Sequence, residues 1–429
     1  MGLFQSKVFK NASWMIGCKI IQSVIGIVIS ALSARYLGPS NFGVINYAAS
    51  IVAFMLPITQ IGMNCTLVKE FVDNPDDEGK TLGTALTLSV LSAILCIFGV
   101  YSFTCFFNAG EKETIFVCVL YSTMLIFQAL ELVIYWFQAH LLSKYVALLS
   151  FAAYLIVSAY KTYLLIEQKN VAWFAVSNAI DYCLISFGLL GVYKKLGGQP
   201  LKFSIKKSKR LLSGSWTYII SGLMATVYAQ TDKVMLNNIT GNTEVGLYSA
   251  AISCITLVSF VFSAIIDSMR PHILSKKNTN TREYEKSVVC LYSIVFYLSM
   301  AYCLFCFIFG EFIIQLLYGE NFVLSVSILR LLAWYGIFNY IGGAQSVWFL
   351  AEGKQKYLTV MGTTGALLNV ILNYILIPQY GCFGAAIATL VTSFVANIAL
   401  CIVIKPLRNN SVLLMKALNP RFLISNFIK

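Results

Sequence analysis

The segment Ser287–Phe309, SVVCLYSIVFYLSMAYCLFCFIF, carries no charged side chain over its whole length. A helix that crosses the hydrocarbon core of a bilayer needs about 20 mostly apolar residues, so this run predicts one spanning helix. Further runs of the same kind occur throughout the chain, and together they predict an all-α polytopic membrane protein with about 12 transmembrane helices. The other predicted spans are 12–34, 42–64, 81–106, 115–138, 145–166, 171–192, 211–235, 245–266, 324–350, 356–377 and 381–404.

The composition supports this prediction and excludes several function classes. Of the 429 residues, 58% are hydrophobic and only 11% are charged, whereas a soluble domain has roughly 25% charged residues. In a soluble protein, a net charge of +13 would suggest a nucleic-acid partner. In this chain we expect the basic linker 193–210 to contact anionic lipid headgroups instead. We therefore expect no nucleic-acid partner.

The cysteines and histidines predict no metal site and no cofactor. The chain has 12 cysteines, and the one C-x-x-C pair, Cys303 and Cys306, lies inside an apolar run. Only two histidines, His140 and His272, are available as further ligands. Buried free cysteines usually behave as small apolar side chains, so neither a disulfide framework nor catalysis is expected from them.

The distribution of lysine and arginine predicts the orientation. If the N-terminus is cytoplasmic, the inner segments hold 24 of the 31 basic residues, and the outer loops hold only Lys112 and Lys169. Positive charge concentrates on the cytoplasmic side of membrane proteins. Both termini are therefore expected in the cytoplasm, with a short cytoplasmic tail.

Two sequence echoes predict an internal repeat. Gly38–Ser50 aligns with Gly241–Ser253 at an offset of 203 residues, and Trp136–Tyr145 aligns with Trp348–Tyr357 at an offset of 212 residues. The basic linker divides the spans six and six, which gives an N-terminal lobe, 1–200, and a C-terminal lobe, 201–429. Because six is even, both lobes enter from the same side, so they are parallel repeats. Repeats around a central cavity are typical of transporters.

Two of these stretches resemble a known family. The residues Arg35–Pro39 with Phe42 and Gly43, and Asp232–Leu236 with Gly241 and Val245, are similar to the polysaccharide-transporter branch of the multidrug/oligosaccharidyl-lipid/polysaccharide exporter superfamily. Within that branch the chain resembles O-antigen (Wzx-type) flippases. The resemblance implies transfer of undecaprenyl-diphosphate-linked oligosaccharide, an O-antigen or similar repeat unit, from the cytoplasmic to the periplasmic leaflet. It also implies a location in the bacterial inner membrane, and a lipid-linked substrate and other polysaccharide-assembly proteins as partners.

Charged residues within the spans indicate a polar interior. An ionisable side chain at mid-membrane costs roughly 2.5–3.5 kcal/mol and normally faces the bundle interior or a wet cavity. Polar residues repeat beside several of them at helical spacing, which indicates polar helix faces. Interhelical hydrogen bonds are the structural alternative for any one of these residues. The predicted substrate path comprises Lys19, Arg35, Glu131, Lys161, Asp181, Asp232, Lys233 and Arg330.

The depths of these residues suggest roles along a path. Lys19 and Glu131 lie toward the cytoplasmic face and are expected to neutralise each other, whereas Arg35, Lys233 and Arg330 lie in the outer half. A diphosphate would meet Lys19 first and the outer cations later, because lysine and arginine bind phosphate oxygens. Asp232 would hold Lys233 or Arg330 while the path is empty, and its protonation would link transport to pH.

Two alternatives differ in function. An ion-coupled multidrug antiporter of the same superfamily is the first, although cationic drugs favour acidic or aromatic pockets and this chain has an excess of cations. A membrane glycan polymerase or ligase is the second, but the longest predicted outer loop, 310–323, offers only Glu311 and Glu320 as acids. No G-x-x-x-x-G-K-[ST] loop is present, so transport by ATP hydrolysis through that motif is excluded.

Overall fold

The computed structural model describes the backbone of residues 7–277 and 280–419, and the side chains of the same ranges apart from 7–21, 23, 24 and 65. Over these ranges the chain is helical and contains no strand, which confirms the predicted fold class. The chain forms two compact units. Unit 1, Met1–Gln230, contains α1 Lys7–Thr59, α2 Leu67–Asp73, α3 Glu78–Phe107, α4 Lys112–Ser122, α5 Met124–Leu130, α6 Ile134–Ala139, α7 Ser143–Ile166, α8 Val171–Lys195 and the start of α9 Ile205–Thr240. The second contains the end of α9 and α10 Asn242–Leu257, α11 Ser259–Lys277, α12 Thr281–Tyr318, α13 Ser325–Ala351, α14 Lys356–Phe394, a π-helix Val395–Ala399, α15 Leu400–Val403 and α16 Arg408–Ala417.

Eight helical segments of the described chain are long and apolar enough to cross a membrane. Two of them contain a sharp bend, because α1 turns at Gly38 (φ 71°) and α14 turns at Gly381 (φ 54°). Glycine adopts positive φ without the steric cost that a Cβ imposes. Each of these long helices therefore contains two of the predicted spans, joined by a tight turn.

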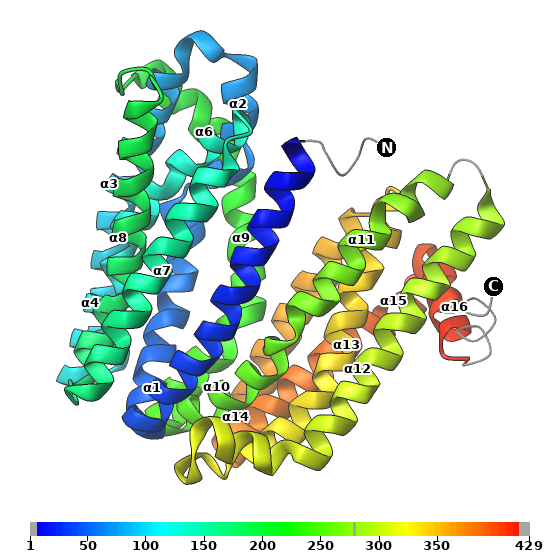
Figure 1. Ribbon diagram of the computed structural model, residues 1–429. Helices are drawn as coiled ribbons and strands as arrows, with labels where there is room; N and C mark the ends of the chain where they lie inside the picture. The colour runs from blue at the N-terminus through cyan, green and yellow to red at the C-terminus, as the bar shows by residue number, and fades with distance from the viewer. Residues whose placement is uncertain (1–6, 278–279, 420–429) are drawn as a thin grey trace. The chain divides into compact units, whose positions relative to one another are not determined.

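The boundary between unit 1, Met1–Gln230, and unit 2, Thr231–Lys429, falls inside α9. In unit 1, α3, α4, α7 and α8 run side by side (Figure 1). Its core includes Trp136, Phe137, Leu189 and Tyr193, and the rings of Trp136 and Tyr193 meet edge to face at 4.8 Å. Packing between helices rather than local propensity therefore positions the polar side chains of this unit.

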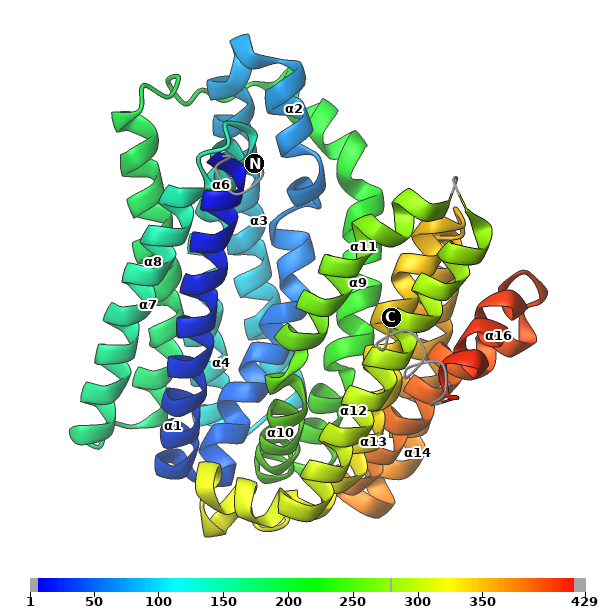
Figure 2. The ribbon, with the colours of Figure 1, turned by 45° about the vertical axis from the view of Figure 1, so that its right-hand side comes forward.

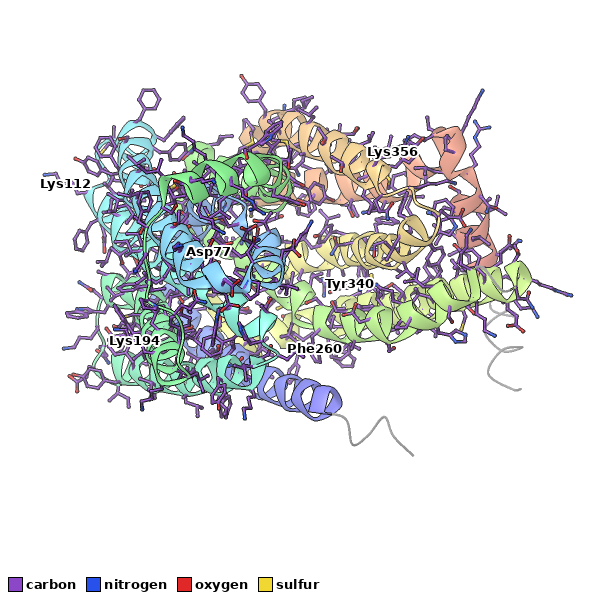
Figure 3. All side chains as sticks on the ribbon, turned by 90° about the horizontal axis from the view of Figure 1, so that it is seen from above. Asp77, Lys112, Lys194, Phe260, Tyr340 and Lys356 are labelled. Atoms are coloured by element: carbon purple, nitrogen blue, oxygen red, sulfur yellow. The ribbon has the colours of Figure 1, made fainter. Side chains whose placement is uncertain are left out.

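Unit 2 is built on α13, which contacts α10, α11, α12 and α14 (Figure 2). Tyr340, labelled in Figure 3, stacks its ring on Phe262 with centroids 3.8 Å apart. This contact joins α13 to α11. The central position of α13 explains why most of its side chains are buried.

The echoing sequences adopt equivalent local structures in the two units. Gly38 and Gly241 have φ/ψ of 71°/173° and 95°/179° and join consecutive helices in the same way. The ring pairs Trp136–Phe137 and Trp348–Phe349 are edge to face at 5.2 and 5.4 Å. These similarities are local to each unit and favour duplication; the division into lobes 1–200 and 201–429 stays a prediction.

Candidate functional site

The structure divides the predicted path residues between the two units. Arg35, Glu131, Lys161 and Asp181 belong to unit 1, and Asp232, Lys233 and Arg330 belong to unit 2. The side chain of Lys19 lies outside the described residues, so its pairing with Glu131 stays a prediction. Each unit is considered separately below.

In unit 1 three of the predicted residues form one charged cluster. Asp181 on α8 interacts electrostatically with Lys161 on α7, and Glu131 interacts with Asp181. All three side chains are half-buried, and Asp181 Oδ1 has no hydrogen-bond partner within the described part of the chain. Two acids and one lysine therefore lie close enough for their charges to interact, so a change of charge on one affects the other two.

An interruption of the fourth predicted span places Glu131 in this cluster. The segment is divided into α4, α5, a 3₁₀ turn Glu131–Val133, and α6. Such a turn within a spanning segment often marks a hinge or local strain. Glu131 therefore begins a short 3₁₀ turn between α5 and α6, within one continuous helical segment, Lys112–Ala139.

A cavity of about 130 Å³ opens beside Lys161. Its polar lining comes from Ser30 and Ser33 on α1, Tyr154, Ser158 and Lys161 on α7, and Asn178 on α8. Polar side chains of the first and fifth predicted spans thus meet at one cavity. One ammonium group surrounded by hydroxyl and amide donors is suited to an anionic group such as a phosphate.

In unit 2 Asp232 is the centre of a buried hydrogen-bond cluster. Its side chain is 5% exposed and accepts three hydrogen bonds. Tyr248 Oη and Thr389 Oγ1 donate to Oδ2 at 2.7 and 2.6 Å, and Asn373 Nδ2 donates to Oδ1 at 2.6 Å. Asn373 Nδ2 also donates to Asn369 Oδ1 at 2.9 Å. The carboxylate is therefore held by neutral donors from α10 and α14.

The chemistry of this cluster suits a mobile positive charge. The adjacent Lys233 interacts electrostatically with Asp232. Asn373 Oδ1 is buried and has no hydrogen-bond partner among the described residues. Carboxylate, amide and hydroxyl oxygens are the ligands that small hard cations prefer, so Asp232, Asn373 and Thr389 are the residues able to hold such a cation. No set of three His, Cys, Asp or Glu side chains positioned for a metal occurs in the described ranges.

Arg330 occupies a different environment from the one expected. Its Nε donates to the carbonyl of Phe307 at 3.3 Å, and its guanidinium lies 5.6 Å from the centre of that ring. Among the described residues, the hydrogen-bond partners of Asp232 do not include Arg330. Arg330 contacts α12 instead, so the expected pair between Asp232 and Arg330 does not form in the described part of the chain. Arg35 is exposed near the end of the first predicted span.

Sequence reasoning missed Tyr248 and Thr389 as partners of Asp232. Tyr248 lies within the Gly241–Ser253 echo, which was the available signal. Thr389 lies in a run of small residues and carries no signal of its own. A second buried carboxylate, Glu78, was also missed: it accepts a hydrogen bond from Trp136 Nε1 at 2.7 Å and joins α3 to α6.

A membrane-spanning helical fold with buried charges in each unit defines a polytopic transporter. The comparisons identify its family: the chain belongs to the polysaccharide biosynthesis protein family, which it matches over residues 8–275. It is 21% identical to the capsular polysaccharide biosynthesis protein CapF of Staphylococcus aureus, over 91% of this chain and 97% of that protein. It is 24% identical to a putative O-antigen transporter of Shigella flexneri, over 89% and 94% of the two chains.

Solved structures show the same fold. The lipid II flippase MurJ in an inward closed conformation matches with a TM-score of 0.76 at 14% identity, covering 94% of this chain and 90% of that chain. An inward-facing multidrug resistance MATE family transporter of the MOP superfamily matches with a TM-score of 0.67 at 13% identity, covering 91% and 96%. The family match and the two relatives confirm the resemblance to polysaccharide transporters, and the solved structures show the shared fold.

Proposed function

We propose that this chain is a flippase that transfers undecaprenyl-diphosphate-linked oligosaccharide, an O-antigen or similar repeat unit, from the cytoplasmic to the periplasmic leaflet of a bacterial inner membrane. The family and the relatives named as an O-antigen transporter and a capsular polysaccharide biosynthesis protein support this proposal. The fold shared with a lipid II flippase supports it further. The same comparisons favour transport over the polymerase or ligase alternative.

The excess of cations in the spans is the observation that distinguishes a flippase from a drug antiporter. The interiors of the predicted spans carry four cations, Lys19, Lys161, Lys233 and Arg330, against three acids, Glu131, Asp181 and Asp232, and Arg35 directly follows the first span. A diphosphate is a natural ligand for such cations, since lysine offers a mobile point charge and arginine a planar fork. A cationic drug would instead need the acids or aromatic rings to be in excess.

The proposed path uses these residues in order of depth. The diphosphate enters near Lys19, which Glu131 neutralises beforehand, and leaves toward the periplasm past Arg35, Lys233 and Arg330. Lys161 and Asp181 provide a charged site in unit 1, and Asp232 keeps Lys233 neutralised until phosphate arrives. Since an unpaired buried charge is costly, Lys19, Lys161 and Lys233 each return to an acid after the substrate leaves.

The proposal includes the orientation and the partners. Both termini lie in the cytoplasm, loops 107–114 and 310–323 lie in the periplasm, and segments 193–210 and 267–286 lie in the cytoplasm. The two lobes, 1–200 and 201–429, move about a central path. Other polysaccharide-assembly proteins supply the substrate and receive the product.

A liposome assay tests the function against its alternative. Purified protein is reconstituted with a fluorescent undecaprenyl-diphosphate glycan or, in parallel, with a cationic dye and an imposed proton or sodium gradient. We expect the glycan to become accessible to an impermeant quencher faster than in protein-free liposomes, with no dye uptake. Gradient-driven dye transport without glycan transfer would favour the multidrug antiporter instead.

A further inference from the structure

The C-terminal helix α16 is attached to unit 2 as an integral part of it. Ile404 is extended (φ −76°, ψ 107°) and redirects the chain after α15, so that α16 packs beside α12 and α15 (Figure 1). Two α12 hydroxyls donate to backbone carbonyls at the end of α16: Ser293 to Ala417 at 2.9 Å and Tyr297 to Leu418 at 2.8 Å. These bonds satisfy carbonyls that a helix end otherwise leaves unpaired.

A chain of buried polar contacts holds the start of α16 in place. Tyr292 Oη donates to Asn410 Oδ1 at 2.7 Å, and Asn410 Nδ2 contacts Cys401 Sγ at 3.8 Å. Further along, Gln345 Nε2 donates to the carbonyl of Asn397 at 3.1 Å, within the π-helix Val395–Ala399. Such π-segments occur frequently at functional sites. The network fixes the gap between α16 and the π-helix, because both sides of it are anchored.

That gap is an apolar cavity of about 170 Å³. An engineered apolar cavity of about 150 Å³ stays dry and binds benzene, so a cavity of this size and lining favours hydrocarbon over water. Ser411 supplies the only hydroxyl of the lining, and its Oγ has no hydrogen-bond partner among the described residues. The apolar lining comprises Phe296, Ile337, Phe338, Ile341, Ile398, Ile402, Leu414, Met415 and Leu418.

Two exposed cations flank the start of α16, a few residues after the lining residue Ile402. Arg408 Nε donates to the carbonyl of Ile402, a lining residue, at 3.2 Å, which holds the guanidinium beside it. Lys405 is exposed on the preceding turn. Neither forms an ion pair with a carboxylate within the described ranges, whereas Lys416, on the same helix, approaches Glu285 at 3.9 Å. Arg408 and Lys405 therefore present uncompensated positive charge close to an apolar slot.

We propose that the cavity beneath α16 binds a segment of one acyl chain of an anionic phospholipid, whose phosphate contacts Arg408 and Lys405. The apolar lining accommodates that segment, and the two cations select the headgroup charge. α16 places both elements together because it presents Arg408 at its start and Leu414 and Met415 on the cavity side. The site goes beyond the proposed transport function, since it requires only that unit 2 lies in a bilayer.

Photo-crosslinking in proteoliposomes tests the site. The full chain is reconstituted in phosphatidylcholine containing a small fraction of phosphatidylglycerol with a diazirine in one acyl chain, and the crosslinked peptides are mapped. We expect the label on the cavity wall, at Phe296, Phe338 or Met415. Arg408→Gln reduces labelling about fivefold, the effect of one basic residue near an anionic surface. Arg282→Gln, which removes an exposed cation elsewhere on unit 2, leaves labelling unchanged.

A cavity-filling variant tests the apolar part. Ser411→Leu fills the slot and removes its one hydroxyl, so it reduces labelling of the wall while the protein stays monodisperse. If Ser411→Leu does not insert, Ile398→Phe fills the cavity from the π-helix side. Unchanged labelling in the filled variant, or equal labelling by a diazirine phosphatidylcholine, would overturn the proposal. Displacement of the label by undecaprenyl phosphate but not by unlabelled phosphatidylglycerol would also overturn it.

Discussion

Asp232→Asn separates the charge of Asp232 from its hydrogen bonds. The asparagine carbonyl still accepts from Asn373, and the hydroxyls of Tyr248 and Thr389 rotate to accept from the new amide group. Hydrogen bonds to a charged group contribute about 1.5–3 kcal/mol each, and neutral ones about 0.5–1.5 kcal/mol. The lost charge assistance is partly offset because a buried charge is removed, so we expect a destabilisation of about 1–3 kcal/mol.

Asp232→Ala provides the comparison for stability. Without the carboxylate, Tyr248 pairs with Thr389, whose oxygen is already 3.1 Å away, but one N–H of Asn373 is left unpaired. A buried unpaired donor costs about 1–3 kcal/mol, so the alanine variant is less stable than the asparagine variant. Thermal denaturation of both purified proteins in detergent measures this order.

A transport assay distinguishes a role of the Asp232 charge in transport from a role in stability. We expect Asp232→Asn to insert and remain monodisperse but to lose glycan transfer in proteoliposomes, because Lys233 no longer has an acid to return to. Tyr248→Phe serves as the matched control, since it removes one donor and keeps the carboxylate, and should retain transfer. Normal transfer by Asp232→Asn would show that Asp232 is only a hydrogen-bonding centre and would refute this reasoning.

Three further predictions follow from the charged residues. Lys202→Cys on a cysteine-free background should react with an impermeant thiol reagent only after permeabilisation; labelling in intact cells would reverse the orientation. Arg330→Ala should abolish glycan transfer in inserted protein while Arg330→Lys keeps part of it, since charge survives without the planar fork; normal transfer by the alanine variant would place Arg330 outside the path. Burial raises the pKa of Glu352, but hydrogen bonds from Lys277 and Tyr284 outweigh it, so the net shift is below the ordinary value of 4.5. A carboxyl group whose pKa is lowered by folding contributes stability above pH 4.5, and this contribution is lost as the pH falls through the lower pKa of the folded state. Glu352→Gln should therefore lose less thermal stability between pH 5 and pH 3 than the wild-type protein does. Equal losses in the two proteins would contradict the ion pair.

The bilayer makes much of this fold predictable from sequence. Runs such as Ser287–Phe309 must be helical because unpaired backbone groups are too costly in hydrocarbon. The stripe of Asn369 and Asn373 was also predictable, since residues four apart share one helix face. The polar cavity in unit 1 followed in the same way from the spacing of Tyr154, Ser158 and Lys161.

Other features depend on contacts that sequence spacing does not specify. The fourth predicted span, 115–138, contains neither glycine nor proline, so nothing in its sequence predicts the 3₁₀ turn at Glu131–Val133. Thr389 reaches Asp232 across 157 residues of chain. The cavity under α16 was missed because the segment after Lys405 was expected to be a cytoplasmic tail.

Comparing two lipids in the liposome assay tests the central claim most directly. Both carry the same glycan and the same polyprenyl chain, but one is joined through a diphosphate and the other through an uncharged linker. If the cations of the spans carry the substrate by its phosphates, the wild-type protein should transfer the diphosphate-linked lipid and leave the uncharged one at the rate of protein-free liposomes. Equal transfer of the two lipids would contradict the account.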